Sequence, residues 1–538
     1  MALSRAIATV GGFTLISRVL GFGRDMLLAA LLGAGPAADA FVVAFKLPNL
    51  FRRLFAEGAF SAAFVPMFAR KLAGEGKEAA RAFAEQAQAA LLLALIVFVA
   101  LGEIFMPWAL ALIAPGFTDD PAKFALAVEL ARITFPYLLF VSLVSLVGGV
   151  LNGLERFAAT SATPVLLNLV MIAGLAGWEW YAPSPAHGAA WGVAVAGLAQ
   201  MVWLYLVMRQ AGFGLRLRRP RLSPDVKRLL VLMLPVALGA GIYQINVVVD
   251  IAIASFLPSG AVSYLYYADR LVQLPLGVVG IAIGTALLPI LARQIRSGEA
   301  EAAMRNQNRA LEVALLLTLP AAVALAALAH PIIQVLFERG AFGPTEVAAT
   351  AAALAAYALG LPAHVLVKVF TPGYFAREDT ASPVRIAIAC MIGNAVLAVA
   401  FMLALRPYDL GHLGIALATT VTGWANALLL ARGLAARGHF HIDARAKKRL
   451  WPMLAASLAM GAALVGLAGL LADWLAGSEP LRIAALALIV AAGLAVYGLG
   501  AQLMGAMDLR ELKGLLRRPA KSETKPSPSD AAGGPDLT

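Results

Sequence analysis

Five cationic side chains lie inside the first two long apolar stretches of the chain: Arg18, Arg24, Lys46, Arg52 and Arg53. A charge at the centre of a bilayer costs about 2.5–3.5 kcal/mol on insertion scales, so five facing lipid would cost on the order of 10–15 kcal/mol. Arginine donates two parallel hydrogen bonds to phosphate and stays charged. The cluster therefore predicts a water-filled cavity that binds an anionic, phosphate-like group.

Carboxylates accompany these cations without balancing them. Asp25, Asp39 and Glu57 are three against five, and we expect them to hold the arginines in place when no ligand is bound. The alternative is that all these charges pair with one another and only lock helices together. Full internal pairing would not leave a surplus of two cations, so the surplus favours a ligand site.

Further candidates lie in the second half of the chain. Asp269 and Arg270 form a doublet of opposite charges within an apolar stretch, with Ser263 upstream, and Lys368 stands alone in a later stretch. These three positions extend the predicted anion site to the second half.

One further group suggests a different ligand. Asp250 follows Asn246 by one helical turn, and together with Asn394 in a later stretch it is a candidate site for a monovalent cation. A hydrogen-bonded polar pair between two helices explains the same residues equally well. No other cofactor is indicated by the sequence.

A membrane must position these residues. Of the 538 residues, 61 % are hydrophobic and 14 % charged, whereas soluble domains have about 45–50 % and 25 %. Apolar runs of the length that crosses a bilayer recur, and lipid requires such runs to be helical. We predict an all-α polytopic protein with fourteen transmembrane helices, at about 5–31, 36–69, 84–106, 124–152, 162–180, 188–208, 229–257, 262–292, 310–329, 346–375, 384–405, 411–431, 450–472 and 481–506.

Positive charge is distributed unequally between the two sides of these spans. With the N-terminus inside, about 31 of the 43 lysines and arginines fall in inner loops and tails, and about four in outer loops, Lys123 among them. This bias predicts that both termini are cytoplasmic. It also assigns the basic loops to topology and to contacts with membrane lipids, and argues against nucleic acid as a partner.

The chain shows traces of a duplication. Residues 66–70 (PMFAR) and 289–293 (PILAR) each end a span, and residues 163–165 (TPV) and 382–384 (SPV) each open one, although chance similarity between apolar segments remains an alternative. Two six-helix lobes with the same orientation would enclose a central site between them. The predicted parts are an N-lobe (1–208), a basic linker that is a candidate amphipathic helix (209–228), a C-lobe (229–431), a second basic linker (432–449), two extra helices (450–506) and a disordered cytoplasmic tail (507–538).

The motifs around the charged residues resemble those of the MurJ (MviN) lipid II flippases of the MOP exporter superfamily. They are residues 17–22 (SRVLGF), 24–25 (RD), 38–41 (ADAF), 45–50 (FKLPNL), 52–60 (RRLFAEGAF), 114–117 (APGF) and 266–271 (YYADRL). The similarity extends to about residue 506, and the motif around 45–66 is highly specific. The first of these motifs begins at Ser17, which adds the hydroxyl of Ser17 to the candidate site.

The resemblance implies a function and roles for single residues. It implies a transporter of the bacterial cytoplasmic membrane that flips lipid II, an undecaprenyl-diphosphate-linked glycopeptide, to the outer leaflet, with the two extra helices forming a groove for the lipid tail. It implies that Arg18, Arg24, Arg52 and Arg270 contact the diphosphate or headgroup, that Asp39 is functionally important, and that cell-wall synthesis proteins are possible partners.

Two positions depart from the family pattern. Some members carry a carboxylate three residues after the arginine that matches Arg270, whereas this chain has Gln273. The sodium site of part of the family is matched by Asp250 and Asn394, but the carboxylate expected one turn after Asn394 is replaced by Ala398.

Other functions fit the sequence less well. A flippase for another polyprenyl-linked glycan, or a cation-coupled multidrug exporter of the same fold, shares the architecture, but an exporter of cationic drugs favours an acidic cavity. A polyprenyl-diphosphate glycosyltransferase needs a catalytic carboxylate in a sizeable aqueous loop, and outer carboxylates are few. We find no phosphate loop, nucleophile elbow or His/Cys metal spacing, so a transporter is expected rather than an enzyme.

Overall fold

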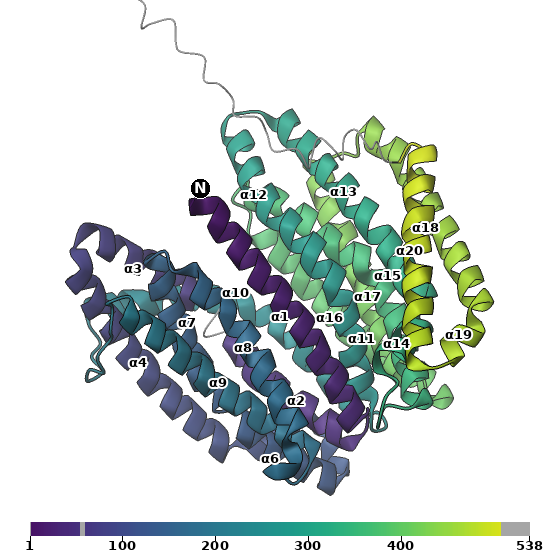
Figure 1. The fold of residues 1–538 in the computed structure, drawn as a ribbon. Coiled ribbons are helices and arrows are strands. Elements are labelled where there is room, and N and C mark those ends of the chain that lie inside the picture. The colour runs from purple at the N-terminus through teal and green to yellow at the C-terminus, as the bar shows by residue number, and fades with distance from the viewer. Residues whose placement is uncertain (1, 54–59, 507–538) are drawn as a thin grey trace, which may run out of the picture.

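A computed structural model of the chain describes residues 2–53 and 60–506, which are mostly helical and contain no strand (Figure 1). Eleven helical segments in these ranges are long and apolar enough to cross a membrane. They are Gly76–Ile104, Pro121–Gly153, Phe157–Ala176, Pro185–Gln210, Ala261–Arg296, Ala300–Ala327, Pro344–Phe375, Ala381–Tyr408, Gly411–Ala436, Ala444–Leu470 and Glu479–Leu503. The prediction of an all-helical, multi-pass membrane protein is confirmed.

The three remaining predicted spans also lie on helices. They are α1 (Ala2–Leu32), α2 (Pro36–Arg52) followed by α3 (Ser61–Gly74), and α10 (Pro224–Ser255). Helices α1 and α2 carry the intramembrane charges, which lower their hydropathy. The structure therefore agrees with about fourteen membrane helices.

The remaining helices form the eleven segments or connect them. They are α4 (Gly76–Ile104), α5 (Met106–Ile113), α6 (Pro121–Thr134), α7 (Tyr137–Gly153), α8 (Phe157–Ala176), α9 (Pro185–Gln210), α11 (Ala261–Pro275), α12 (Ile281–Arg296), α13 (Ala300–Ala327), α14 (Ala329–Phe337), α15 (Pro344–Phe375), α16 (Ala381–Leu405), α17 (Gly411–Ala436), α18 (Ala444–Leu470), α19 (Ala472–Ala476) and α20 (Glu479–Leu503). The short helices α5, α14 and α19 each follow a span that runs away from the N-terminal side. We call their side the outer end and the opposite side the inner end.

The helices form two bundles, which correspond to the predicted lobes (Figure 1). Helices α2 to α9 form the first, α11 to α17 form the second, and α18 and α20 lie beside the second against α13. Helix α1 packs along α8, and α10 contacts α3 and α4 on one side and α16 on the other. The bundles come together at the outer end and diverge toward the inner end, where the N-terminus lies.

A helix break separates α11 from α12. Helix α11 ends at Pro275 and continues through a π-helical turn, η4 (Leu276–Gly280), into α12. Proline has no backbone N–H, and a π-helical turn changes the hydrogen-bond register, so carbonyl groups near the break can accept from other partners. Such breaks are tolerated at membrane depth where protein or water covers the freed groups.

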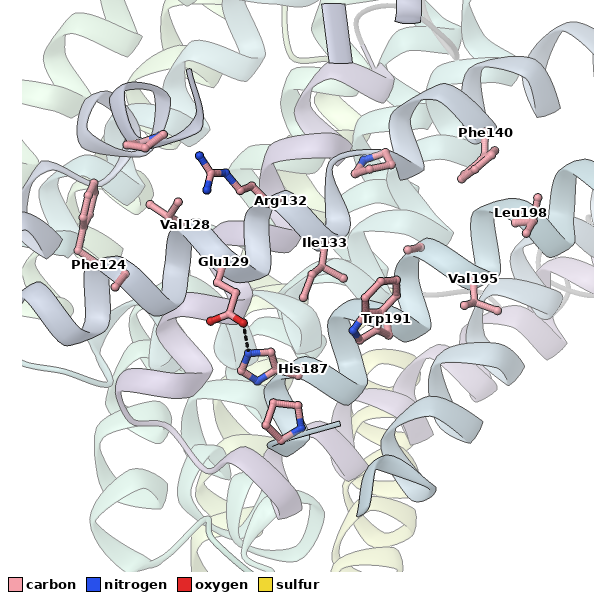
Figure 2. A pocket seen from close by; sticks show the side chains of 15 residues that line it. Phe124, Val128, Glu129, Arg132, Ile133, Phe140, His187, Trp191, Val195 and Leu198 are labelled. Carbon is pink, nitrogen blue, oxygen red and sulfur yellow. Dashed lines mark ion pairs between the residues drawn. The ribbon is translucent and has the colours of Figure 1, made fainter. Parts of the chain in front are cut away.

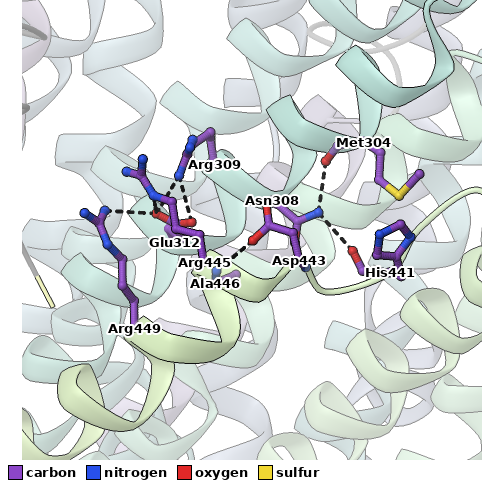
Figure 3. Close-up of polar contacts among 9 residues, drawn as sticks. All are labelled: Met304, Asn308, Arg309, Glu312, His441, Asp443, Arg445, Ala446 and Arg449. Carbon is purple, nitrogen blue, oxygen red and sulfur yellow. Dashed lines mark hydrogen bonds and ion pairs between the residues drawn. The ribbon is translucent and has the colours of Figure 1, made fainter. Parts of the chain in front are cut away.

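A buried carboxylate fastens the inner end of α18 to α13 (Figure 3). Glu312 is 5 % exposed and accepts from Arg309 on its own helix (3.0 Å) and from Arg445 and Arg449 on α18 (3.3 and 3.2 Å). Removing one partner from a buried ionic group leaves an uncompensated charge, so such groups hold their elements firmly. This contact fixes α18, and α20 behind it, beside the second bundle.

The basic linker 209–228 is not an amphipathic helix, which corrects the prediction. Residues 211–223 form a turn and an irregular segment between α9 and α10. Glu85 on α4, 1 % exposed, accepts from the backbone N–H of Arg216 (3.0 Å) and from the guanidinium of Arg218. These contacts take the place of helical hydrogen bonds in the linker. Pro220 also disfavours a helix there, because it lacks a backbone N–H. The predicted disordered tail, 507–538, lies outside the described residues.

Candidate functional site

Two arginines from opposite bundles contact one carboxylate. Arg24 on α1 donates to Asp25 Oδ1 through Nε and Nη2 (3.1 and 2.7 Å), and Arg270 Nε on α11 lies 3.4 Å from Asp25 Oδ2. Tyr266 donates to Asp25 Oδ1 (3.2 Å) and accepts from Arg270 Nη2 (2.8 Å). We call these four residues the central cluster. It contains two guanidinium groups and one carboxylate, so it carries a net positive charge.

The protein holds both guanidinium groups in fixed positions. Arg24 is 6 % exposed, its Nη1 donates to Asn168 Oδ1 (3.1 Å), and its Cζ lies 5.6 Å from the ring centroid of Phe45. Arg270 lies over the ring of Tyr266, with Cζ 4.7 Å from the centroid. Its Nε is buried and makes no hydrogen bond within the described residues, although it lies within ion-pair distance of Asp25 Oδ2. A prepositioned donor of this kind suits an incoming anion.

Arg18 contacts the helix break from the opposite bundle. Its Nη1 lies 3.5 Å from the carbonyl oxygen of Leu274, and a Cβ added to Gly277 would lie 2.5 Å from its Nη2. Ser17 accepts from Asn168 Nδ2 at its carbonyl oxygen (2.9 Å) and at Oγ (3.3 Å). Asn168 therefore connects Ser17 to the central cluster, while Arg18 lies beside the cluster toward the inner end.

The other cations of the N-lobe lie outside the central cluster. Lys46 on α2 is half-buried, with Nζ 6.0 Å from the ring centroid of Tyr266, and no carboxylate of the described chain lies within ion-pair distance of it. Arg52 is half-buried and Arg53 is exposed, at the end of α2. Glu57 lies outside the described residues.

In this conformation Arg24 lies in the central cluster, and the convergence of Arg18, Arg52 and Arg53 with it on one bound anion stays a prediction. Helical rise places Arg24 about 9 Å from Arg18 along α1. Arg52 lies sixteen residues, or about 24 Å, from the outer end of α2, and Arg18 lies fourteen residues, or about 21 Å, from the outer end of α1. Arg18 and Arg52 therefore lie at a similar depth, nearer the inner end than Arg24.

Two candidates in the second lobe have other partners than expected. Asp269 accepts from Gln273, one turn later, and does not pair with Arg270. The guanidinium of Arg270 is directed instead toward Tyr266 and Asp25. Lys368 on α15 is exposed and packs its aliphatic stem near Gly280 and Gly284.

Asp39 joins the two bundles at the outer end. It is 1 % exposed, and its Oδ2 accepts from Lys123 Nζ and from the N–H of Gly260 (both 2.8 Å). Its Oδ1 accepts from the N–H and Oγ of Ser263 (2.9 and 2.7 Å). The carboxylate thus caps the N-terminus of α11, where the helix dipole favours negative charge. We call these four residues the outer latch, and the structure places Asp39 and Ser263 in it rather than in the central cluster.

Glycines allow the backbones of the bundles to touch beside the latch. Gly260 has φ +103°, and a Cβ there would lie 2.5 Å from the carbonyl oxygen of Ala34. Gly116 donates its N–H to Ser255 Oγ (2.9 Å), and a Cβ there would lie 2.3 Å from the carbonyl oxygen of Ser255. A larger residue at either position would separate the two bundles.

Comparison with known proteins decides the family. The family model for "Lipid II flippase MurJ" matches residues 28–485. The "Probable lipid II flippase MurJ" of Rhizobium meliloti (strain 1021) is 46 % identical over 539 residues, 99 % of each chain. The chain belongs to the MurJ family. A solved structure, "Lipid II flippase MurJ, inward closed conformation", is 26 % identical with a TM-score of 0.75, covering 94 % of this chain and 99 % of that one.

The fold extends beyond the MurJ family. A "multidrug resistance MATE family transporter of the MOP superfamily" in its inward-facing conformation is 16 % identical, with a TM-score of 0.65 over 80 % of this chain and 98 % of that one. At that identity the match concerns the fold alone. Together with the MurJ structure it confirms the predicted MOP exporter fold.

The predicted cation-site residues of this MurJ-family chain do meet. Asn394 on α16 donates through Nδ2 to Asp250 Oδ1 (2.8 Å) and Asn246 Oδ1 (3.3 Å) on α10, and Thr422 on α17 donates to Asn394 Oδ1 (3.2 Å). This is the geometry of a polar pair between helices. Cation binding would need Asn394 to turn its oxygen toward Asp250, because an N–H₂ group cannot ligate a metal.

Glu129 and Arg132, one turn apart on α6, have different partners. Glu129 Oε1 lies 3.2 Å from Nε2 of His187 (Figure 2), and Arg132 Nε donates to the carbonyl oxygen of Glu103 (3.3 Å). Both line an apolar groove of about 1000 Å³ on the outer half of the first bundle. In the MurJ-family fold, these contacts join α6 to its neighbours α9 and α4.

Two residues of the site in this MurJ-family chain are not predicted as site residues from the sequence. Lys123 was expected in an outer loop, but it is 6 % exposed in the first turn of α6. A signal was present, since Asp120 before Pro121 is a helix-start pattern that begins the span earlier. Asn168 was equally visible as an amide within an apolar run.

Proposed function

We propose that this chain flips lipid II from the inner to the outer leaflet of the bacterial cytoplasmic membrane by alternating access, with both termini in the cytoplasm. The proposal rests on the observation that Arg24 and Arg270, from opposite lobes, both contact the carboxylate of Asp25. A diphosphate has more charge and more acceptor oxygens than a carboxylate, so it can displace Asp25 from between the two arginines. The family relationship supplies lipid II as the substrate.

The closed outer latch and the divergence of the bundles support a state that receives substrate from the inner side. The diphosphate passes Arg18 and then reaches Arg24 and Arg270, while the polyprenyl tail stays in lipid along α18 and α20. Bridging by the diphosphate draws the lobes together at the inner end. The outer latch then opens, and the headgroup is released outside.

The membrane potential favours the loaded step. Moving one negative charge outward gains about 2.3 kcal/mol per 100 mV, and a diphosphate gains about twice that. The positively charged cluster moves outward with the diphosphate, which offsets part of this gain, and it returns inward along the field in the empty carrier. In the empty state Asp25 lies between the two arginines, which reduces the net charge that moves in the return step.

Translocation of lipid II in reconstituted vesicles tests the function, with the potential and the sodium gradient varied independently. We expect an inside-negative potential to accelerate outward flipping, and removal of sodium to leave the rate unchanged because Ala398 supplies no second carboxylate near Asp250. Absence of lipid II translocation under every gradient would refute the proposed function. A rate proportional to the sodium gradient would instead assign a sodium site to Asp250 and Asn394.

Gly116→Ala is expected to lower the translocation rate about tenfold or more. The added methyl group meets the backbone of Ser255, so the outer ends of the lobes cannot close and the inward-facing state is lost. Gly35→Ala is the matched control, because nothing lies within 4 Å of its added Cβ at the same end of the molecule. Equal rates for the two variants would show that this contact does not matter for transport.

A further inference from the structure

A second basic site lies at the inner end of the first lobe, away from the central cluster. A pocket of about 520 Å³ opens between the inner end of α9 and the linker that follows it. Its polar lining includes Arg81 on α4, Arg209 at the end of α9, and Arg216 on the linker. Its apolar lining includes Val202 and Leu206, which are 45 % and 50 % exposed on the surface of α9.

The linker builds this pocket through specific contacts. Arg81 Nη2 donates to the carbonyl oxygen of Gly212 (3.0 Å), and its Cζ lies 5.3 Å from the ring centroid of the buried Phe213. Glu85 accepts from the N–H of Arg216, which fixes the next part of the linker. These contacts fix the guanidinium of Arg81 and the backbone of the linker at Arg216.

The pocket lacks a compensating anion among the described residues that line it. A neighbouring carboxylate, Glu85, is 1 % exposed and already accepts from the guanidinium of Arg218 and from the backbone N–H of Arg216. Arg81 Nε is buried and has no hydrogen-bond acceptor in the described ranges. Three guanidinium groups thus surround a space that a phosphate group would fill.

The surroundings favour a lipid over a soluble anion. Val202 and Leu206 belong to a predicted span and continue the pocket toward the membrane interior, as an acyl chain requires. On the linker, Leu217 and Leu222 are 70 % and 65 % exposed, the arrangement expected of a segment that lies on the membrane surface. We propose that this pocket binds the phosphate headgroup of an anionic phospholipid of the inner leaflet, with an acyl chain along α9.

Binding would tie the linker to the first lobe. Residues 211–223 connect α9 to α10, which is the only covalent path between the lobes. A lipid held by Arg81, Arg209 and Arg216 bridges α4, α9 and the linker at once. The composition of the inner leaflet would then influence how freely the lobes move.

Lipid titration of the purified full-length protein tests this site. The midpoint of thermal unfolding is measured in zwitterionic detergent while phosphatidylglycerol, phosphatidylcholine or inorganic phosphate is added. We expect phosphatidylglycerol to raise the midpoint of the wild type, and expect the Arg209→Gln/Arg216→Gln variant to need about tenfold to thirtyfold more of it. Both arginines are exposed, so this variant should still fold, and Arg81 is left in place to hold the linker.

Arg219→Gln/Arg221→Gln is the matched control, since it removes two exposed charges from the same linker outside the pocket. This control should titrate like the wild type. Equal titration of wild type and pocket variant would overturn the proposal, as would equal losses in both variants, which indicate diffuse attraction to basic loops. An equal response to inorganic phosphate would assign the pocket to a soluble anion instead.

Discussion

Asp39→Ala is expected to abolish lipid II translocation and to destabilise the inward-facing state by about 3–5 kcal/mol, because the substitution leaves the ammonium of Lys123 buried without its carboxylate. It also removes the acceptor for the N–H of Gly260 and for both donors of Ser263. Loss of these contacts opens the outer end when the inner end is still accessible. Thermal unfolding of the purified protein and translocation in vesicles measure the two effects.

Two further variants separate a latch from a general loss of folding. Asp39→Ala/Lys123→Met removes the uncompensated charge, so we expect much of the stability to return while translocation stays lost. Glu129→Gln removes a carboxylate that is 61 % exposed at the same end, and should behave like the wild type. Full recovery of transport in the double variant would mean that Asp39 only neutralises Lys123 and does not act as a latch.

Most of the fold follows from the sequence because hydropathy and charge bias report on the solvent around each segment. Lipid forces apolar runs into helices, so the predicted spans coincide with helices of the structure. The linker 211–223 is the exception. Its conformation depends on Glu85, more than 120 residues away, and no local pattern reveals such a partner.

The candidate site was predictable in residue type but not in pairing. Charges within apolar runs identified Arg24, Asp25 and Arg270, since their cost in lipid implies a protein or water environment. Their partners depend on helix rotation and depth, which sequence spacing within one helix does not give. Asp39 illustrates this point, because its partners Lys123 and Ser263 come from helices α6 and α11, distant in sequence.

Arg24→Ala is expected to reduce translocation more than a hundredfold while the protein stays in the membrane. Two charge-assisted hydrogen bonds to a phosphate contribute about 1.5–3 kcal/mol each, and 1.4 kcal/mol corresponds to tenfold. Arg270→Ala should show a similar loss, since it removes the contact from the opposite lobe. Arg132→Ala is the control, because this arginine is exposed outside the central cluster. Wild-type rates for Arg24→Ala would refute capture by these arginines.

Asp25→Asn tests whether the carboxylate of Asp25 occupies the place of the diphosphate or instead belongs to the site that binds the diphosphate. If Asp25 occupies the place of the diphosphate, its neutralisation removes a competitor and leaves two arginines without an anion. The variant should then be less stable alone and gain more thermal stability than the wild type from a polyprenyl diphosphate, since a ligand stabilises the state that it binds. If Asp25 instead orients Arg24 for the ligand, the gain should fall below that of the wild type. A larger gain in Asp25→Asn, lost again on adding Arg24→Ala, would establish that the carboxylate and the diphosphate exchange at one site between the lobes.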